Sequence, residues 1–225
     1  SPKFRNFFFN SFIDANGWIC AKRKYTKGVA TSSMVGYILG LGDRHLNNIL
    51  IDTTTGEPIH IDLGIAFDQG RLLKIPELVP FRLTRDIIDG FGITGVEGIF
   101  RRTCEQVLNV LSRDSEKVMC VLNILKWDPL YSWAVSPFKK HKYMYDDNLE
   151  GHMTTATNNS KVIERKLTPK LDSDENQQSY RALKGVQEKL DRNGLTIEAT
   201  VEKLIQEAVD ESNLALIFNG WSPFY

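Results

Sequence analysis

The stretch of residues 40–64, GLGDRHLNNILIDTTTGEPIHIDLG, constrains the fold of this 225-residue chain more than any other. It contains two short β-type runs, Ile49-Leu50-Ile51 and Ile59-His60-Ile61, and the residues between them include a glycine and a proline. Apolar, β-branched runs bounded by turn-forming residues are typical of strands. We therefore expect an antiparallel hairpin with a longer loop, in which residues 49–52 pair with residues 59–62.

Apolar residues at helical spacing surround this hairpin on both sides. They mark segments at residues 4–12, 17–39, 99–111, 118–125, 180–190 and 201–209. Gly194 is expected to end one helix and Thr196 to cap the next at its N-terminus. Residues 65–80 show weak periodicity and three helix breakers, which indicates an ordered loop. The sequence therefore predicts a mainly α fold with one small β hairpin.

Residues 136–176 differ in composition from the rest of the chain. They are polar and include the run Thr154-Thr155-Ala156-Thr157-Asn158-Asn159-Ser160. Such a segment cannot bury enough apolar area to offset the entropy lost on ordering. We expect a polar linker there.

Charge and cysteine content exclude several classes of protein. Lys+Arg and Asp+Glu both number 28, so no overall basic field attracts nucleic acid or an anionic membrane surface. No apolar run approaches the roughly 20 residues that a membrane-spanning helix needs, and we expect a soluble protein without a membrane partner. The three cysteines are far apart, which argues against a disulfide framework and favours a reducing compartment.

The predicted hairpin gathers oxygen ligands at its open end. Asn48 precedes the first strand and Asp62 follows the second, so the two side chains should lie a few ångströms apart. Mg²⁺ binds through one or two protein oxygens together with substrate phosphates, and an amide oxygen and a carboxylate suit it. Asp43 lies five residues before Asn48, the separation found between the catalytic Asp and the metal-binding Asn of protein kinases. The pattern indicates phosphoryl transfer.

The order of these residues points to a particular group of kinases. GDRHLNNILI together with HIDLG resembles the catalytic and metal-binding loops of the phosphatidylinositol 3-kinase-related kinase family, in which Asp-Arg-His replaces the His-Arg-Asp of ordinary protein kinases. VPFRLTRDIIDGFGITGVEGIFRR resembles the end of that family's activation loop, and LIQEAVDESNLALIFNGWSPFY resembles its C-terminal FATC segment. Within the family, the segments VATSSMVGYILGLGDRH and RLTRDIIDGFGITGVEG are most similar in sequence to the ATM kinases and their fungal telomere-maintenance relatives.

The resemblance implies a role for each residue of the motif. Asp43 resembles the base that orients the substrate hydroxyl and accepts its proton. His45 resembles the histidine that faces the transferred γ-phosphoryl group, where an imidazole can stabilise developing charge. Asn48 and Asp62 resemble the ligands of Mg²⁺, or Mn²⁺, which bridges the phosphates of the co-substrate ATP. Arg44, between the base and the histidine, is expected to pack structurally or to pair with a carboxylate.

The resemblance also implies a domain organisation. Residues 1–135 would form the C-terminal lobe of a kinase domain, 136–176 the linker, 177–194 a helix, and 195–225 a FATC segment docked beside the activation loop. The phosphate-covering loop and the nucleotide-binding lysine of an N-terminal lobe are not identifiable before Asp43, so the fragment alone is expected to be inactive.

For the parent protein, the resemblance implies phosphorylation of protein Ser or Thr followed by Gln, in nuclear DNA-damage and telomere signalling. It also implies a homodimer, contacts with the rest of its own chain, and recognition of DNA ends through other proteins. Two alternatives remain open. A lipid kinase shares the Asp-Arg-His motif but would need a basic activation loop, whereas this loop offers Arg71 and Lys74 against Asp68 and Glu77. A non-catalytic scaffold would have no chemical reason to keep Asp43, Asn48 and Asp62.

Overall fold

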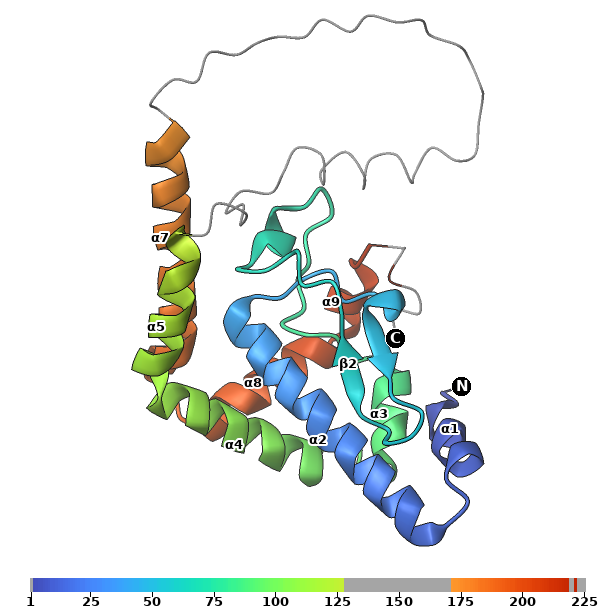
Figure 1. The fold of residues 1–225 in the computed structure, drawn as a ribbon. Coiled ribbons are helices and arrows are strands. Elements are labelled where there is room, and N and C mark those ends of the chain that lie inside the picture. The colour runs from blue at the N-terminus through green and yellow to red at the C-terminus, as the bar shows by residue number, and fades with distance from the viewer. Residues whose placement is uncertain (1, 128–170, 219–220, 222–225) are drawn as a thin grey trace, which may run out of the picture.

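The computed structural model describes residues 2–127, 171–218 and 221. It is mainly helical with one antiparallel hairpin, which confirms the predicted fold class (Figure 1). The first elements are α1 (Phe4–Ser11), α2 (Ala15–Leu39), η1 (Leu46–Asn48), β1 (Ile49–Ile51) and β2 (Pro58–His60). They are followed by η2 (Gln69–Leu72), α3 (Arg85–Phe91), α4 (Ile99–Arg113), α5 (Ser115–Ile124), η3 (Leu125–Trp127), α7 (Leu171–Asp191), η5 (Arg192–Gly194), α8 (Ile197–Val209) and α9 (Glu211–Ala215).

Helix α2 is the central element of the fold. It begins at an Asp14 cap, whose side chain accepts a 2.8 Å hydrogen bond from the Gly17 amide, and it ends at Gly40, which has a left-handed φ of 60°. Helix α4 packs along it. Fully buried side chains at that contact include Ala30 and Met34 of α2 and Cys104 of α4. This helix pair forms the core on which the catalytic loops are mounted.

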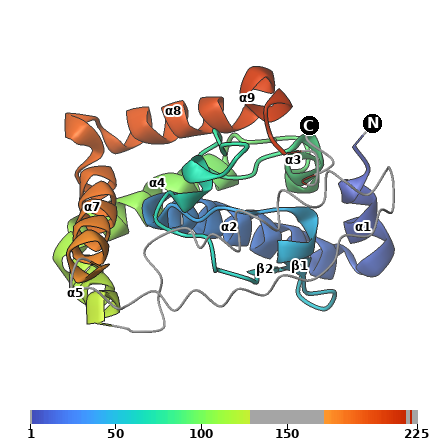
Figure 2. The same ribbon diagram turned by 90° about the horizontal axis from the view of Figure 1, so that it is seen from above.

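The other elements cover α2 from two sides. In Figure 2, α8 and α9 lie on one side of α2 and the hairpin lies on the other. Helices α5 and α7 lie side by side at one end of α2 (Figure 1). The predicted cap of α8 is confirmed, because the Thr196 hydroxyl accepts a hydrogen bond from the Ala199 amide at 3.2 Å. No helix in the described ranges is long and apolar enough to cross a membrane.

The hairpin forms where expected, but its predicted register is wrong by two residues. Ile49 pairs with His60, whereas pairing residues 49–52 with 59–62 would have opposed Ile49 to Asp62. The loop accounts for the shift. Asp52 donates its amide to the Glu57 carbonyl at 2.9 Å, and its carboxylate accepts from the Thr54 amide at 2.7 Å, so the chain has already turned before Pro58. A two-residue shift keeps every side chain on its predicted face.

Helix α7 begins at Leu171, inside the segment expected to be a linker. A helix can extend beyond the residues that bury its apolar face, because each added residue gains a backbone hydrogen bond. The boundary between linker and helix that we predicted from polar composition, after residue 176, is therefore wrong. The rest of the predicted linker lies outside the described residues, as do the terminal aromatic residues Phe224 and Tyr225.

Candidate active site

Arg44 holds the site together. The side chain is almost fully buried, with a relative exposure of 3%, and its guanidinium donates to backbone carbonyl oxygens. Nε donates to Gly42 at 2.8 Å and Nη1 to Ile61 at 2.8 Å, while Nη2 donates to Asp62. Gly42 directly precedes Asp43, the candidate base, and Asp62 is a candidate metal ligand. Arg44 therefore links the loop that carries Asp43 to the loop that carries Asp62. Arg44 was expected either to pack structurally or to pair with a carboxylate, and these bonds to main-chain carbonyls support the structural role.

The hairpin brings Asn48 and Asp62 to its open end, as predicted. The Ile61 amide donates to the Asn48 carbonyl at 3.1 Å, one residue before Asp62. Asn48 is buried, and its Nδ2 donates to the main-chain carbonyl of Asp43 at 2.8 Å. Asp62 has a left-handed φ of 51°, and its Oδ1 accepts from the Gly64 amide at 3.2 Å. Asn48 therefore contacts both neighbours of the predicted site. Its side chain bonds to the main chain of Asp43, and its own carbonyl bonds to the residue before Asp62.

Asp43 also has left-handed backbone geometry, with φ 57°. A non-glycine residue in this region is strained and persists only where its surroundings hold it. Side chains hold Asp43 through its main chain on both sides, because Asn48 binds its carbonyl and Glu77 Oε1 accepts from its amide at 2.8 Å. Its own side chain is mostly shielded, with 14% exposure. The backbone of the candidate base is therefore fixed independently of its carboxylate.

His45 lies beside the candidate base. Its Nε2 is 4.0 Å from Asp43 Oδ1, and its side chain is 29% exposed. Its Nδ1 accepts a hydrogen bond from the Asn47 amide at 3.2 Å, so that nitrogen carries no proton. In the neutral imidazole the proton then resides on Nε2, the nitrogen directed towards Asp43. The structure brings His45 and Asp43 together and leaves the imidazole accessible.

Glu77 belongs to this site, although from the sequence it was expected only to add a negative charge to the activation loop. It comes from the activation loop, residues 65–80, and reaches the Asp43 amide across 34 positions of sequence. The pKa of its carboxyl group is raised to about 7, mainly by burial and also by the charge of Asp43, while the hydrogen bond from the Asp43 amide and the charge of Arg44 act in the opposite direction. Motif spacing could not identify Glu77, because no sequence period relates it to Asp43.

Lys189 of α7 is a second residue that the sequence analysis missed. Its Nζ lies 2.7 and 2.8 Å from the two carboxylate oxygens of Asp68, in the activation loop, and donates to the Tyr37 carbonyl at 3.0 Å. Burial lowers the pKa of Lys189, and the charge of Asp68 opposes that effect. The contact joins α7, α2 and the activation loop at one point.

The C-terminal segment lies against the activation loop, as the resemblance implied. Leu214, Ile217 and Trp221 form a small buried cluster, with Val79 of the loop packed against it. The Arg82 guanidinium lies over the Trp221 ring, 5.6 Å from its centroid. Trp221, with Phe218, also lines a small cavity that Asp43 and Glu77 share. The tail therefore reaches the immediate surroundings of the candidate base.

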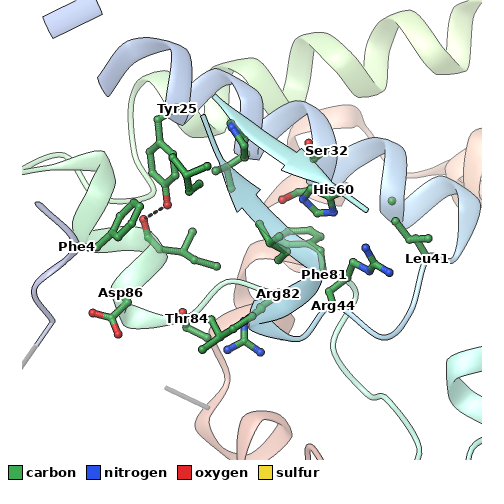
Figure 3. Close-up of a pocket in the computed structure, with 18 of the residues that line it drawn as sticks. Phe4, Tyr25, Ser32, Leu41, Arg44, His60, Phe81, Arg82, Thr84 and Asp86 are labelled. Carbon is green, nitrogen blue, oxygen red and sulfur yellow. Dashed lines mark hydrogen bonds between the residues drawn. The ribbon is translucent and has the colours of Figure 1, made fainter. Parts of the chain in front are cut away.

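A much larger cavity lies under the hairpin (Figure 3). It has a volume of about 440 Å³ and a mainly apolar lining that includes Tyr25, Ile49, His60 and Phe81. The Nδ1 atom of His60 is buried there without a hydrogen-bond partner in the described part of the chain. Asp43, Asn48 and Asp62 are not among its lining residues, although Arg44 is. This cavity is thus on the inner side of the hairpin, apart from the candidate catalytic groups.

The donor set fits a hard divalent cation. Asn48 has its amide nitrogen engaged by Asp43, which leaves the amide oxygen as the donor atom, and Asp62 supplies a carboxylate at the same end of the hairpin. Within residues 2–127, 171–218 and 221, no cluster of three or more His, Cys, Asp or Glu side chains could hold a metal ion. A site of one amide and one carboxylate leaves the remaining positions to water and phosphate oxygens.

Two family models match this chain. One, described as phosphatidylinositol 3- and 4-kinase, matches residues 1–135, and the other, described as FATC domain, matches residues 194–225. Similar proteins carry kinase names. The serine/threonine-protein kinase TEL1 of Saccharomyces cerevisiae is 66% identical over 224 residues, which are 100% of this chain and 8% of that protein. The tel1 kinase of Neurospora crassa is 45% identical over 228 residues, covering 99% of this chain and 8% of that protein.

Solved structures agree with these matches. The FAT and kinase domain of CtTel1 has a TM-score of 0.83 and 40% identity, covering 100% of this chain and 14% of that one. The Tel1 kinase butterfly symmetric dimer has a TM-score of 0.81 and 63% identity, covering 100% of this chain and 8% of that one. The chain spans about 8% of the length of the curated relatives. Because the first family model covers more than half of its 225 residues, the resemblance is confirmed and the chain belongs to the phosphatidylinositol 3- and 4-kinase family.

Proposed function

We propose that this chain is the catalytic lobe of a serine/threonine protein kinase that transfers the γ-phosphoryl group of ATP to a protein hydroxyl. One observation carries the proposal: Arg44 fastens the Asp43 loop to the Asp62 loop, with Asn48 hydrogen-bonded between them. Phosphoryl transfer depends mainly on positioning and on neutralising charge, and this arrangement serves both. The names of the relatives, serine/threonine-protein kinases, support the same activity.

Asp43 acts as the base in this proposal. Its carboxylate accepts the proton of the substrate hydroxyl, which makes the oxygen a better nucleophile as the bond to phosphorus forms. The fixed main chain of Asp43 keeps that carboxylate in position. His45, with its proton on Nε2, donates towards the phosphoryl oxygens and stabilises the charge that develops there.

Asn48 and Asp62 hold the divalent cation, Mg²⁺ or Mn²⁺. When bound, such a cation neutralises phosphate charge and orients the γ-phosphoryl group for in-line attack. The outer face of the hairpin suits the rest of the nucleotide. Leu50 and Ile59 pair across the strands there and are 46% and 48% exposed, although both are apolar. A purine ring lying on that face would cover them.

The proposed substrate is a protein. A phosphoinositide would bring several negative charges to the activation loop, and the cations available there are poorly placed to meet them. Lys189 is engaged by Asp68, and Arg71 lies 4.0 Å from the same carboxylate. Following the family resemblance, we propose Ser or Thr followed by Gln as the preferred site. We further propose nuclear DNA-damage and telomere signalling, with DNA ends recognised through other proteins.

The same proposal covers the organisation of the protein. Residues 1–135 form the C-terminal kinase lobe, 136–170 a linker, 171–194 a helical segment and 195–225 the FATC segment. A homodimer of the longer protein is proposed, supported by the solved structure described as a Tel1 kinase butterfly symmetric dimer. The lobe would work with an N-terminal lobe that supplies the remaining phosphate contacts.

The test uses the full-length protein with Asp43→Ala and Asp43→Asn. We expect wild type to phosphorylate a Ser-Gln peptide in the presence of Mg²⁺ and ATP, at least tenfold better than a matched Ser-Ala peptide. Both variants should lose about 10²–10⁴-fold in kcat, the usual contribution of a general base, with unchanged thermal stability. Activity on phosphoinositide vesicles instead of peptide would replace the protein-kinase proposal with a lipid-kinase one. Retained peptide phosphorylation in both variants would contradict the assignment of Asp43.

A further inference from the structure

Glu77 reaches from the activation loop to the main chain of the candidate base. Its Oε1 accepts the Asp43 amide hydrogen at 2.8 Å, and its own amide donates to the Gly70 carbonyl at 3.2 Å. Asn48 holds the carbonyl of Asp43 from the other side at 2.8 Å. The two hydrogen-bonding groups of the Asp43 main chain therefore both meet side chains, one from the catalytic loop and one from the activation loop.

Two glycines make room for the Glu77 carboxylate. A Cβ added at Gly70 would lie 2.3 Å from Glu77 Oε2, and one added at Gly42 would lie 2.5 Å from the same atom. Neither glycine has a positive φ, so backbone conformation does not require glycine at either position. At Gly70, the three atoms nearest to an added Cβ all belong to the Glu77 carboxyl group. The absence of a side chain there is explained by the carboxylate that occupies the space.

We propose that Glu77 is a positioning residue that sets the orientation of the base Asp43 and makes it depend on an ordered activation loop. The inference rests on the proposed kinase function. Asp43 has a left-handed φ of 57°, a conformation that an aspartate adopts at a cost unless something holds it. The hydrogen bond from its amide to the Glu77 side-chain oxygen offsets that cost, because a shielded amide that lost its acceptor would be destabilising. When residues 65–80 are displaced, Asp43 loses this bond and its carboxylate loses its orientation.

The burial of Glu77 agrees with this role. Glu77 is partly buried, and desolvation of its carboxyl group raises the pKa of that group to about 7. Among the candidate catalytic groups, Glu77 is hydrogen-bonded to Asp43 at its main-chain amide. Its influence on the reaction would pass through Asp43.

The experiment compares four forms of the full-length protein with wild type: Glu77→Ala, Glu77→Gln, Gly70→Ala and the Glu77→Ala/Gly70→Ala double variant. Glu77→Ala removes the acceptor, and Gly70→Ala pushes the carboxylate out of its space. Each should lower kcat by about 10–100-fold, the effect of misplacing a catalytic group by about an ångström, while the KM for ATP changes less than about threefold. Glu77→Gln keeps an acceptor oxygen and should recover most of the activity. The double variant should be no worse than Glu77→Ala.

A second readout does not depend on activity. Hydrogen exchange of the peptide covering residues 40–46 should accelerate in Glu77→Ala and Gly70→Ala, and should stay near wild type in Glu77→Gln. Gly185→Ala is the matched glycine control, because a Cβ there would meet nothing within 4 Å. Glu188→Ala is the matched glutamate control, since its side chain is 58% exposed. If Glu77→Ala unfolds, the Gln and Gly70 variants decide the question.

Two results would overturn the inference. One is wild-type kcat and exchange in both Glu77→Ala and Gly70→Ala. The other is a double variant whose loss equals the product of the two single losses, because independent effects would then replace a shared one. Failure of the kinase function is distinguishable: in that case Asp43→Ala itself would leave peptide phosphorylation unchanged.

Discussion

At the scale of single residues, Arg44 decides the geometry of the site. A guanidinium offers five N–H donors in one plane, which lets a single side chain reach carbonyl oxygens in two loops at once. Here it bonds to Gly42 and Ile61 at 2.8 Å each, and it also reaches Asp62. A lysine has the same charge but only one nitrogen, so it cannot replace this set of bonds.

Arg44→Lys should therefore destabilise the catalytic lobe by about 2–4 kcal/mol, because several buried carbonyl groups lose their donor. The concentration of Mg²⁺ needed for half-maximal kinase activity should rise, since Asp62 is no longer fastened to the catalytic loop. Thermal melting and a Mg²⁺ titration would measure both effects. Arg71→Lys is the control, because Arg71 is 65% exposed. Equal behaviour of the two variants would contradict the role given to Arg44.

Glu77 predicts a pH dependence of stability. Burial raises the pKa of its carboxyl group from the ordinary 4.5 to about 7, so its contribution to stability is fully present below pH 4.5 and is lost as the pH rises through 7. The complete change is on the order of 3 kcal/mol. The charged groups that face or surround it are Asp43, Arg44, Asp68, Arg71, Lys74 and Lys189.

A glutamine side chain has no carboxyl proton to lose as the pH rises, so this pH dependence should vanish in Glu77→Gln. The melting temperature of wild type minus that of Glu77→Gln should fall steadily between pH 5.5 and pH 8 in the full-length protein. A difference that stays constant over this range would show that Glu77 does not titrate as described.

At the scale of secondary structure, local sequence explains most of what is seen. The helices follow apolar periodicity, and the Asp14 and Thr196 caps lie next to it. The hairpin register was missed by two residues because Asp52 and its hydrogen bonds to Thr54 and Glu57 decide where the turn closes. The periodicity of apolar residues indicates which face of a helix or strand is buried. It contains no information on hydrogen bonds made by side chains within a loop.

The residues of the candidate site likewise fall into those that local sequence could predict and those that it could not. Asp43, His45, Asn48 and Asp62 could be proposed from the sequence because they lie within one hairpin, where spacing fixes proximity. Glu77 and Lys189 could not, because they meet their partners across 34 and 121 positions of sequence. Such contacts depend on how helices pack, which no local pattern specifies.

Helix α7 is tied to the activation loop by Lys189, and this contact is testable. Lys189→Met should cost about 1–3 kcal/mol, because Asp68 loses its partner and the Tyr37 carbonyl loses a donor. Limited proteolysis within residues 65–80 should become faster in the full-length protein. Lys184→Met on the same helix is the control, since Lys184 is 63% exposed and pairs with the exposed Glu188 at 3.8 Å. The same cleavage rate in both variants would count against the contact.

At the scale of the whole molecule, the site is assembled from distant parts of the chain. The hairpin supplies the candidate base and ligands, residues 65–80 supply Glu77 and Asp68, and the C-terminal segment covers that loop. Helix α2 connects them, because its end at Gly40 leads directly into the catalytic loop. Activity should therefore respond to changes far from the reacting atoms.

Trp221→Ala tests this dependence. The indole is only 4% exposed and packs with Leu214 and Ile217, so its loss should weaken docking of the tail by about 3–5 kcal/mol. We expect lower kinase activity and faster hydrogen exchange in residues 77–82. Leu216→Ala, in the same segment but at a residue 59% exposed, should change neither. An active Trp221→Ala enzyme with wild-type exchange would leave the tail without influence on the loop.

The hydrogen bonds of Arg44 to main-chain oxygens have a consequence for how this family can diverge. Every residue offers the same carbonyl group whatever its side chain, so a replacement at Ile61 need not disturb the guanidinium. The arginine itself has no such freedom. Among homologous proteins, we therefore expect the arginine at position 44 to be conserved while the residues that supply the carbonyl groups vary.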